Sequence, residues 1–436
     1  MKLNKKRTFL VGLAFMSICA FWQVYDGIVP QMLKYTFGIG DTVSGVVMAI
    51  DNVLALFMLP LFGTLSDKTH SKIGRRMPYI LCGTAFEVVS MMLIPFAERE
   101  KNFILFFIAL GVCLVSMATY RSPAVALMPD VTPKPLRSQA NGVINLMGAV
   151  GGTIMLGLIT VLVPKIDKDA ANIVMPDCTP IFLIAAGIMV VCVVVLFLTV
   201  NEPKTVAAMR EESRSLGIEE DPEPVAGEAE EKLPKSVLTS LILIVVTVAL
   251  FFMGYNAVTT AFSKYCVEVF GMSAGGYASV LLIAQVAAII AYLPVGWIAG
   301  KIGRRKTIMI GLALMALAFI GATFATAITP IVYVLFILAG AGNAFVVVNT
   351  LVMVVEMSKG ATIGKYTGLY YTFSMAAQIV TPIASGAVLQ FAGYKYLFPY
   401  AALFEVLAIV PMFFVKHGDS KPISKKSKLE AFDVED

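Results

Sequence analysis

Long apolar runs alternate with short polar connections along the whole 436-residue chain. An apolar run of about 18 residues or more predicts a membrane-spanning helix, because about 20 residues cross the hydrocarbon core of a bilayer. Twelve such runs occur, at residues 8–33, 42–65, 77–97, 102–128, 138–163, 178–200, 236–262, 275–300, 305–325, 330–357, 364–391 and 395–416. Transmembrane β-strands would instead show short segments of alternating hydrophobicity. The pattern therefore predicts an all-α integral membrane protein with 12 transmembrane helices.

The composition agrees with this pattern. Hydrophobic residues make up 58% of the chain and charged residues 14%. In soluble proteins about half of the residues are hydrophobic and about a quarter are charged. The first apolar run follows Lys5, Lys6 and Arg7, but it is too long for a secretory signal and contains Asp26. The six cysteines show no metal-binding or disulfide spacing. The net charge of +5 follows the membrane topology and does not indicate nucleic-acid binding.

Lysine and arginine are unevenly divided between the two sets of connections. One set holds sixteen of them, at residues 1–7, 66–76, 129–138, 300–306 and 356–365. The opposite set holds seven, at residues 34–41, 97–102, 164–177, 263–274, 326–329 and 392–396. Because positively charged connections stay in the cytoplasm, we expect a multi-pass protein of the plasma (inner) membrane with both termini cytoplasmic.

A polar stretch divides the chain in the middle. Residues 201–235 contain ten acidic residues, five basic residues and four prolines, which is typical of a hydrophilic tether, partly helical near Met209. The chain is thus expected to consist of four parts: an N-terminal six-helix bundle (1–200), a cytoplasmic linker loop (201–235), a C-terminal six-helix bundle (236–416) and a cytoplasmic tail (417–436).

Two motifs recur at matching places in the two halves. "GTLSDKTHSKIGRRMPYI" follows the second predicted helix, and "GWIAGKIGRRKTI" follows the eighth. "PDVTPKPLRSQANGVIN" follows the fourth helix and "VEMSKGATIGKYTGLYY" the tenth, with eleven residues from Asp130 to Asn141 and from Glu356 to Thr367. Matched motifs at matched places indicate a parallel repeat, as in transporters built from two pseudo-symmetric six-helix bundles.

These motifs resemble those of the major facilitator superfamily (MFS), and the resemblance covers essentially the whole chain. The residues that carry it are Gly63, Asp67, Lys68, Gly74, Arg75 and Arg76. The long spacing between Asp67 and Gly74, together with "YRSPAVALMPDV" at 120–131, is similar to the sucrose/proton symporters and the related glycoside–pentoside–hexuronide:cation symporters. The resemblance implies the MFS fold, a transport function and no enzymatic activity.

One departure from this branch concerns the coupling ion. Melibiose-type members hold a cation with carboxylates in helices 2 and 4, and the matching positions here are Ala55, Leu59 and Arg121. A sodium site of that type is therefore not expected, and no cofactor or metal is expected beyond a coupling proton.

The resemblance also implies a cytoplasmic gate that opens and closes between the two halves. Its expected members are Asp67, Arg75, Arg76, Asp130 and Arg137 in the first half and Arg304, Arg305 and Glu356 in the second. Exchange of such ion pairs biases the equilibrium between inward-open and outward-open states.

Charged residues inside the hydrocarbon region are functional candidates, because burying them there is costly. We assign proton coupling to Asp26 or Asp51, since a carboxylate in a low-dielectric cavity can bind a proton. Arg121 stays charged and is assigned to substrate binding or charge compensation. The resemblance places the helices of Glu87 and Glu405 outside the cavity, so these two are expected to be local hydrogen-bonding partners.

Polar and aromatic residues on the helices expected to line the cavity indicate a polyol-like ligand. The candidates for substrate binding are Trp22, Gln23, Tyr25, Arg121, Asn141, Asn145, Tyr255, Asn256, Thr259, Tyr370, Tyr371 and Gln378. The leading hypothesis is a monomeric, proton-coupled symporter of a sugar or glycoside that works by alternating access. The alternatives are a proton antiporter that exports a drug or another organic compound, and a membrane receptor without transport activity.

Overall fold

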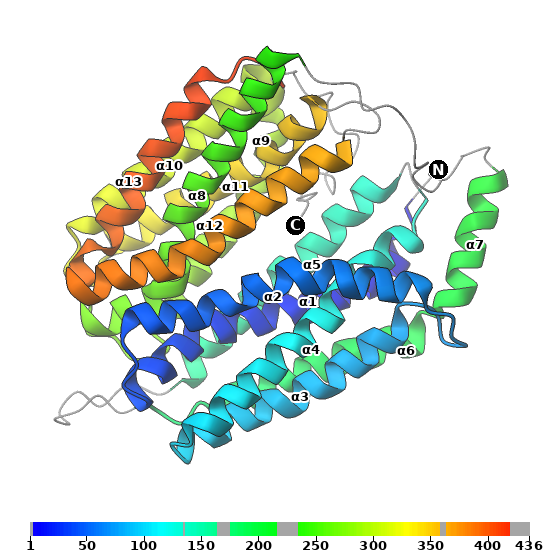
Figure 1. The fold of residues 1–436 in the computed structure, drawn as a ribbon, viewed down its shortest axis with the longest axis horizontal. Coiled ribbons are helices and arrows are strands. Elements are labelled where there is room, and N and C mark those ends of the chain that lie inside the picture. The colour runs from blue at the N-terminus through cyan, green and yellow to red at the C-terminus, as the bar shows by residue number, and fades with distance from the viewer. Residues whose placement is uncertain (1–2, 134–135, 164–174, 216–233, 358–362, 419–436) are drawn as a thin grey trace. The chain divides into compact units, whose positions relative to one another are not determined.

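The computed structural model describes residues 3–133, 136–163, 175–215, 234–357 and 363–418, and all regular structure among them is helical (Figure 1). The α-helices are α1 (Lys5–Gln31), α2 (Asp41–Lys68), α3 (Met77–Arg99), α4 (Phe103–Asp130), α5 (Arg137–Leu162), α6 (Thr179–Thr199), α7 (Glu202–Ser215), α8 (Lys235–Glu268), α9 (Tyr277–Ile302), α10 (Arg304–Thr323), α11 (Pro330–Met357), α12 (Ile363–Phe391) and α13 (Leu397–Phe414). A π-helical turn (Met32–Thr36) follows α1, and a short 3-10 helix (Tyr394–Tyr396) precedes α13. All of the α-helices except α7 are long and apolar enough to span a membrane, which confirms the twelve predicted spans.

Local sequence signals explain several helix ends. The side chains of Asn4 and Asn102 accept hydrogen bonds from backbone N–H groups in the first turns of α1 and α4, because those groups have no acceptor within the helix. At the other end, Gly303 has φ +91° between α9 and α10, and Gly393 has φ +103° after α12. Glycine reaches such angles without the clash of a Cβ atom, so both helices stop at these residues.

The first compact unit contains Met1–Gly38 and Val53–Pro222. Within it, α1 packs on α5 and α6, and α3 packs on α4 and α6. Close contacts between these helices depend on small residues, as is usual in membrane bundles. A Cβ atom on Gly151 of α5 would lie 2.1 Å from the carbonyl oxygen of Met16 in α1, and one on Gly83 of α3 would lie 2.8 Å from the Cβ of Tyr120 in α4.

The second compact unit contains Ile39–Asn52 and Glu223–Asp436. Within it, α8 packs on α12 and α13, and α10 packs on α11 and α13. Helix α8 thus has the place of α1, α10 that of α3, and α11 that of α4. This correspondence confirms the two pseudo-symmetric bundles. Helix α2 is divided between the units, since its residues up to Asn52 belong to the second unit and those from Val53 to the first.

Part of the predicted linker is a regular helix. Residues 202–215 form α7, where the side chain of Met209 is buried and the Ser213 hydroxyl donates a hydrogen bond to its sulfur. The rest of the linker up to residue 233 and the predicted tail beyond residue 418 lie outside the described residues.

Candidate functional site

Two arginines lie at the start of α3, in the first copy of the repeated motif. Arg75 forms two hydrogen bonds with the carboxylate of Asp130, of 2.5 and 3.1 Å, from the end of α4. Arg76 reaches the same carboxylate at 2.8 Å and also pairs with Asp67 and with the hydroxyl of Ser66 at the end of α2. A planar guanidinium suits this arrangement, because its donors point in several fixed directions at once. The arginines therefore join the ends of α2, α3 and α4.

A third carboxylate completes this group. Glu202, the first residue of α7, accepts hydrogen bonds from the backbone N–H groups of Arg75, Arg76 and Met77 at 2.8 to 3.1 Å. These groups stand at the start of α3, where they have no acceptor within the helix and where a negative charge is favoured. We call Asp67, Arg75, Arg76, Asp130 and Glu202 the arginine network.

Gly74 makes room for this contact. Its φ is +114°, and a Cβ atom at this position would lie 2.2 Å from Oε2 of Glu202. The Gly-Arg-Arg turn can be read from the sequence, but no sequence signal marks Glu202 as a functional residue. It lies among ten acidic residues of the linker, and nothing in its neighbourhood marks it for a role at α3.

We expect Glu202→Gln to lower the stability of the first unit. The amide would keep one acceptor oxygen but would turn a donor toward the N–H groups of α3, which costs about 1–3 kcal/mol for the lost charge-assisted bonds. The apparent melting temperature of the purified protein in detergent measures the effect. Glu211→Gln is the control, since Glu211 is an exposed residue of the same helix. Equal melting temperatures of the two variants would contradict the role of Glu202.

The second copy of the motif forms the equivalent ion pair in its own unit. Gly303 adopts a positive φ, as Gly74 does, and Arg304 pairs with Glu356 at the end of α11. Arg305 donates instead to the carbonyl oxygen of Phe413 and lies over the ring of the same residue, 5.6 Å from its centroid. The two motifs therefore form the same kind of ion pair at Arg75 and Arg304, and Arg305 adds a contact with Phe413 of α13.

The ion pairs of Arg75, Arg76 and Arg304 described above each lie within one unit. Arg137 donates from Nε to the carbonyl oxygen of Thr132 at 3.3 Å. Ion pairing of the first-half residues with Arg304, Arg305 or Glu356 during a transport cycle stays a prediction.

The predicted intramembrane charges differ in their surroundings. Asp26 in α1, Asp51 in α2 and Arg121 in α4 are partly buried. Asp51 accepts hydrogen bonds from the backbone and the side-chain amide of Asn52, at 2.6 and 2.8 Å. The three side chains are therefore not sealed inside the helix packing, and their roles in proton coupling and substrate binding stay predictions.

The two remaining acids are completely buried. Glu87 of α3 accepts a hydrogen bond from the thiol of Cys113 in α4 at 3.1 Å, as expected for a local partner. Glu405 of α13 lies against Gly254 of α8, and neither of its oxygens has a hydrogen-bond partner among the described residues. The interpretation of Glu405 as a hydrogen-bonding partner is therefore wrong for this structure.

The aromatic candidates divide into accessible and buried side chains. Trp22 is partly exposed on α1 and packs edge-on against Tyr25, with ring centroids 5.4 Å apart. Tyr25 itself is only 1% exposed. On α12, the hydroxyl of Tyr370 is buried in a hydrogen bond with Thr350 of α11. Tyr25 and Tyr370 therefore serve helix packing in this conformation, whereas Trp22 is accessible.

The polar candidates are partly buried side chains on four helices. They are Gln23 on α1, Asn141 and Asn145 on α5, Asn256 and Thr259 on α8, and Gln378 on α12, together with the aromatic residues Tyr255 and Tyr371. Gln23 lies next to Gly152, so it stands at the contact of α1 with α5. The hydroxyl of Thr259 donates to the carbonyl oxygen of Asn256 at 3.3 Å, and Gln378 donates to Ser374.

Helices α2 and α4 meet near the positions where the resemblance implies the cation ligands of related symporters. The hydroxyl of Ser122, next to Arg121 in α4, donates to the carbonyl oxygen of Leu59 in α2 at 2.7 Å. Leu59 of α2 and the neighbour of Arg121 in α4 thus lie at one contact. Arginine, alanine and leucine occupy the places of the three carboxylates there.

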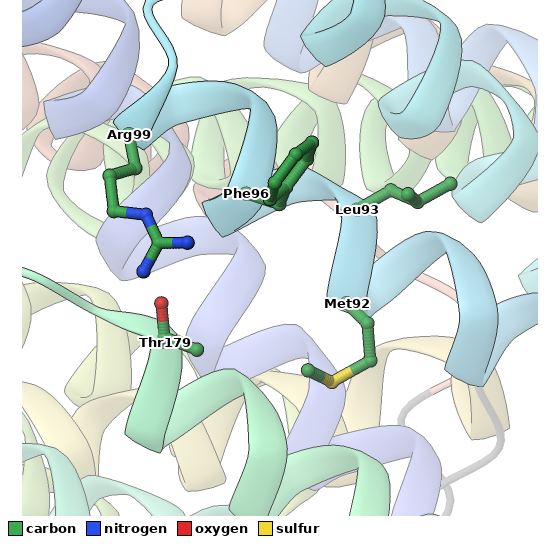
Figure 2. Close-up of a pocket in the computed structure, with 5 residues that line it drawn as sticks. All are labelled: Met92, Leu93, Phe96, Arg99 and Thr179. Atoms are coloured by element: carbon green, nitrogen blue, oxygen red, sulfur yellow. The ribbon is translucent and has the colours of Figure 1, made fainter.

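A cavity of about 400 Å³ lies at the other end of the first unit, between α3 and α6. Figure 2 shows Met92, Leu93 and Phe96 along α3, with Arg99 and Thr179 at one end. Leu93 and Phe96 are exposed side chains of a membrane-spanning helix, so this cavity is open to lipid chains. No predicted site residue lines it, and we do not regard it as the transport site.

Known proteins resemble this chain in sequence and in fold. The isoprimeverose transporter of Lactiplantibacillus pentosus is 23% identical over 66% of this chain and 58% of its own length. Sucrose transport protein SUC3 of Arabidopsis thaliana is 27% identical over 27% of this chain and 23% of its own length. A solved bacterial homologue of the human lysosomal transporter Spinster has the same fold, with a TM-score of 0.69 at 13% identity over 95% of this chain and 97% of that one.

The chain thus matches less than two thirds of the length of these two curated relatives. The sequence model of the Major Facilitator Superfamily, in contrast, matches residues 11–291 and again 244–434. These matches cover nearly the whole chain and both of its repeats. The chain belongs to the Major Facilitator Superfamily, whose members are membrane transporters and not enzymes.

Proposed function

We propose that this protein is a secondary active transporter that moves a sugar or glycoside by proton symport with alternating access. The observation that carries the proposal is the similarity to a transporter of isoprimeverose and to a sucrose transport protein. Both relatives are named for sugars, and they come from a bacterium and a plant.

The partly exposed candidates for substrate binding suit a sugar or glycoside. Trp22 and Tyr255 offer aromatic faces, and Asn256 and Asn145 offer amide donors and acceptors on partly buried surfaces. Binding sites for small molecules combine apolar walls with a few polar groups that fix the orientation of the ligand. A sugar needs both, because its C–H faces stack on rings while its hydroxyls exchange hydrogen bonds.

We propose the proton as the coupling ion because the residues at the expected cation-binding positions of α2 and α4 do not suit a metal cation. A hard cation needs several oxygen ligands, and Ala55 and Leu59 supply no side-chain oxygen. The guanidinium of Arg121 would repel a cation by about 4 kcal/mol at 4 Å and an effective dielectric constant of about 20. Asp26 and Asp51 are then the groups that take up and release the proton.

The excess of lysine and arginine in one set of connections supports an orientation with both termini in the cytoplasm of a plasma (inner) membrane. In this orientation the arginine network lies on the cytoplasmic side, and the start of α2 lies on the outer side. We propose that the transporter works as a monomer, with a small-molecule substrate and the lipid bilayer as its partners.

Uptake of radiolabelled sugars and glycosides by right-side-out vesicles tests this function. We expect at least one compound of the panel to accumulate when the outside is acidic, and a protonophore to abolish that accumulation. Replacement of sodium by potassium at fixed pH should change the rate by less than about twofold, and vesicles without the protein give the background. Accumulation in inverted vesicles alone would indicate an exporter, and strong stimulation by sodium would contradict proton coupling.

A further inference from the structure

The cavity between α3 and α6 has an apolar part and a polar end. Met92, Leu93 and Phe96 line it along α3, and Arg99 is the last residue of that helix. Figure 2 shows the guanidinium of Arg99 facing the hydroxyl of Thr179, to one side of the three apolar side chains. From Met92 to Arg99 the helix rises by about 10 Å. The cavity therefore extends from inside the membrane span to its end.

The apolar part of the cavity is exposed on a helix that spans the membrane. Leu93 is 38% exposed and Phe96 is 45% exposed, within a span that covers residues 77–99. In a bilayer, acyl chains cover such a surface, because there is no water at this depth. A chain inside a hollow of about 400 Å³ is surrounded on several sides, whereas a chain on a flat helix face has protein contacts on one side only. The cavity thus favours a bound chain over a passing one.

Two opposite charges stand at the polar end. Arg99 is exposed at the end of α3, and Asp177 lies two residues before the start of α6. The carboxylate of Asp177 accepts hydrogen bonds from the hydroxyl and the backbone N–H of Thr179, at 2.5 and 2.9 Å. These hydrogen bonds and the nearby charge of Arg99 lower the pKa of Asp177, so its carboxylate is charged at neutral pH. A cation and an anion are therefore presented together where the membrane span ends.

A phospholipid has the same division into apolar and charged parts. Its phosphate forms charge-assisted hydrogen bonds with arginine, and a guanidinium has five donors, so Arg99 can bond a phosphate while it stays near Asp177. A primary ammonium group can donate to the carboxylate of Asp177. We propose that the cavity binds one zwitterionic glycerophospholipid, with an acyl chain along α3, its phosphate at Arg99 and its ammonium group at Asp177.

Quenching of tryptophan fluorescence by brominated acyl chains measures this binding. The chain has two tryptophans, Trp22 and Trp297, so Phe96→Trp in a Trp22→Phe/Trp297→Phe background places a single reporter in the cavity. The purified full chain is reconstituted in vesicles of an uncharged digalactosyl lipid that contain a small fraction of a brominated lipid. The brominated lipid is phosphatidylethanolamine, or the digalactosyl lipid itself, which carries the same chains but no phosphate.

We expect phosphatidylethanolamine to quench the Phe96→Trp reporter with an apparent affinity about tenfold higher than that of the digalactosyl lipid, because of its charge-assisted bonds. Phe86→Trp in the same background is the matched control reporter. Phe86 is 63% exposed on α3, about three turns before Phe96. The two brominated lipids should quench the control reporter to within about twofold of each other, as expected for chains on an open helix face.

Substitutions at the polar end test the head group. Arg99→Gln should lower the preference for phosphatidylethanolamine about tenfold, to the level of the control reporter. Lys101→Gln is the matched charge control, since Lys101 is an exposed cation two residues further along the chain, and it should leave the preference unchanged. Phosphatidylglycerol carries a phosphate but no ammonium group, so it should bind more weakly than phosphatidylethanolamine, and Asp177→Asn should remove that difference.

Equal quenching of the Phe96→Trp reporter by phosphatidylethanolamine and the digalactosyl lipid would show only the general lipid shell of the protein. That result would overturn the proposal without any variant of Arg99. Equal losses from Arg99→Gln and Lys101→Gln would replace the site by a general effect of surface charge. Binding of phosphatidylglycerol as tight as that of phosphatidylethanolamine would contradict the role of Asp177.

Inorganic phosphate in the buffer tests the other source of the same chemistry. If it relieves the quenching at millimolar concentration, the polar end is a site for a free anion and the lipid proposal is wrong. Persistent quenching supports a ligand that needs its acyl chain. The assay contains no transported substrate, so these outcomes do not depend on whether the protein carries a sugar or on which ion drives it.

Discussion

Replacement of Asp26 by asparagine should abolish uphill accumulation of the substrate and leave exchange across the membrane intact. Asparagine cannot bind or release a proton, so the protein loses the step that couples the proton gradient to the substrate. Exchange of external for internal substrate needs no net release of a proton and should continue. With one proton per substrate and a gradient of one pH unit, the wild type can accumulate the substrate about tenfold, and Asp26→Asn should stay near onefold.

Proteoliposomes with an imposed pH gradient measure both activities in one preparation. Asp26→Glu is the control for the position, because it restores a protonatable group and should recover part of the accumulation. Asp51→Asn tests the second candidate in the same assay. Full accumulation by both asparagine variants would exclude Asp26 and Asp51 as the coupling residues, and loss of exchange in Asp26→Asn would instead indicate a defect in substrate binding.

The largest loss of stability is expected from Arg76→Ala. The side chain of Arg76 is 4% exposed and bonds Asp67, Asp130 and Ser66. Its removal leaves the nearly buried carboxylate of Asp130 with Arg75 as its remaining cation and takes away the guanidinium donor to the hydroxyl of Ser66. Loss of one partner of a buried ion pair costs about 3–5 kcal/mol, so the apparent melting temperature in detergent should fall by several degrees.

The repeat provides the matched control for this variant. Arg305 has the equivalent place in the second motif, but its side chain is less buried than that of Arg76; it donates to the carbonyl oxygen of Phe413 and lies over the ring of that residue. Arg305→Ala should therefore lower the melting temperature by less than half as much. Arg76→Lys should be intermediate, because a single ammonium group cannot reproduce the fork of the guanidinium. Equal shifts of the melting temperature for Arg76→Ala and Arg305→Ala would show that the bonds of Arg76 in the arginine network add no stability beyond that supplied by Arg305.

The repeated positions could be predicted from the sequence for a physical reason. Both Gly-Arg-Arg motifs follow a membrane span, and both acidic partners stand eleven residues before a polar position of the next helix. Membrane spans restrict where polar turns can lie, so equal spacing in the sequence becomes equal spacing in the fold. The pairs Arg75–Asp130 and Arg304–Glu356 are the result.

Contacts whose positions are not restricted by the membrane spans could not be predicted from the sequence. Glu202 lies 125 residues from Met77 in the sequence, and any of several linker acids could have satisfied the same N–H groups. Asp41 and Lys264 are 223 residues apart. An acid at the start of one helix and a lysine near the end of another each have an ordinary explanation in the helix dipole. The Nζ atom of Lys264 lies 2.7 Å from Oδ1 of Asp41, and this pairing depends on where the start of α2 meets the end of α8, which no local pattern determines.

The division of α2 between the two units has a consequence for recombination between related transporters. An exchange of halves at the linker would take residues 39–52 from one parent and α8 and α12 from the other. A Cβ atom on Gly45 of α2 would lie 2.0 Å from the carbonyl oxygen of Pro382 in α12, and one on Gly386 of α12 would lie 2.4 Å from that of Asp41. In the chimera, the two sides of these close contacts and of the ion pair between Asp41 and Lys264 would come from different parents. A chimera that keeps its first turns of α2 together with the C-terminal helices of the same parent preserves this matched surface. The point at which the chain is most easily cut is therefore not the point at which its structure divides.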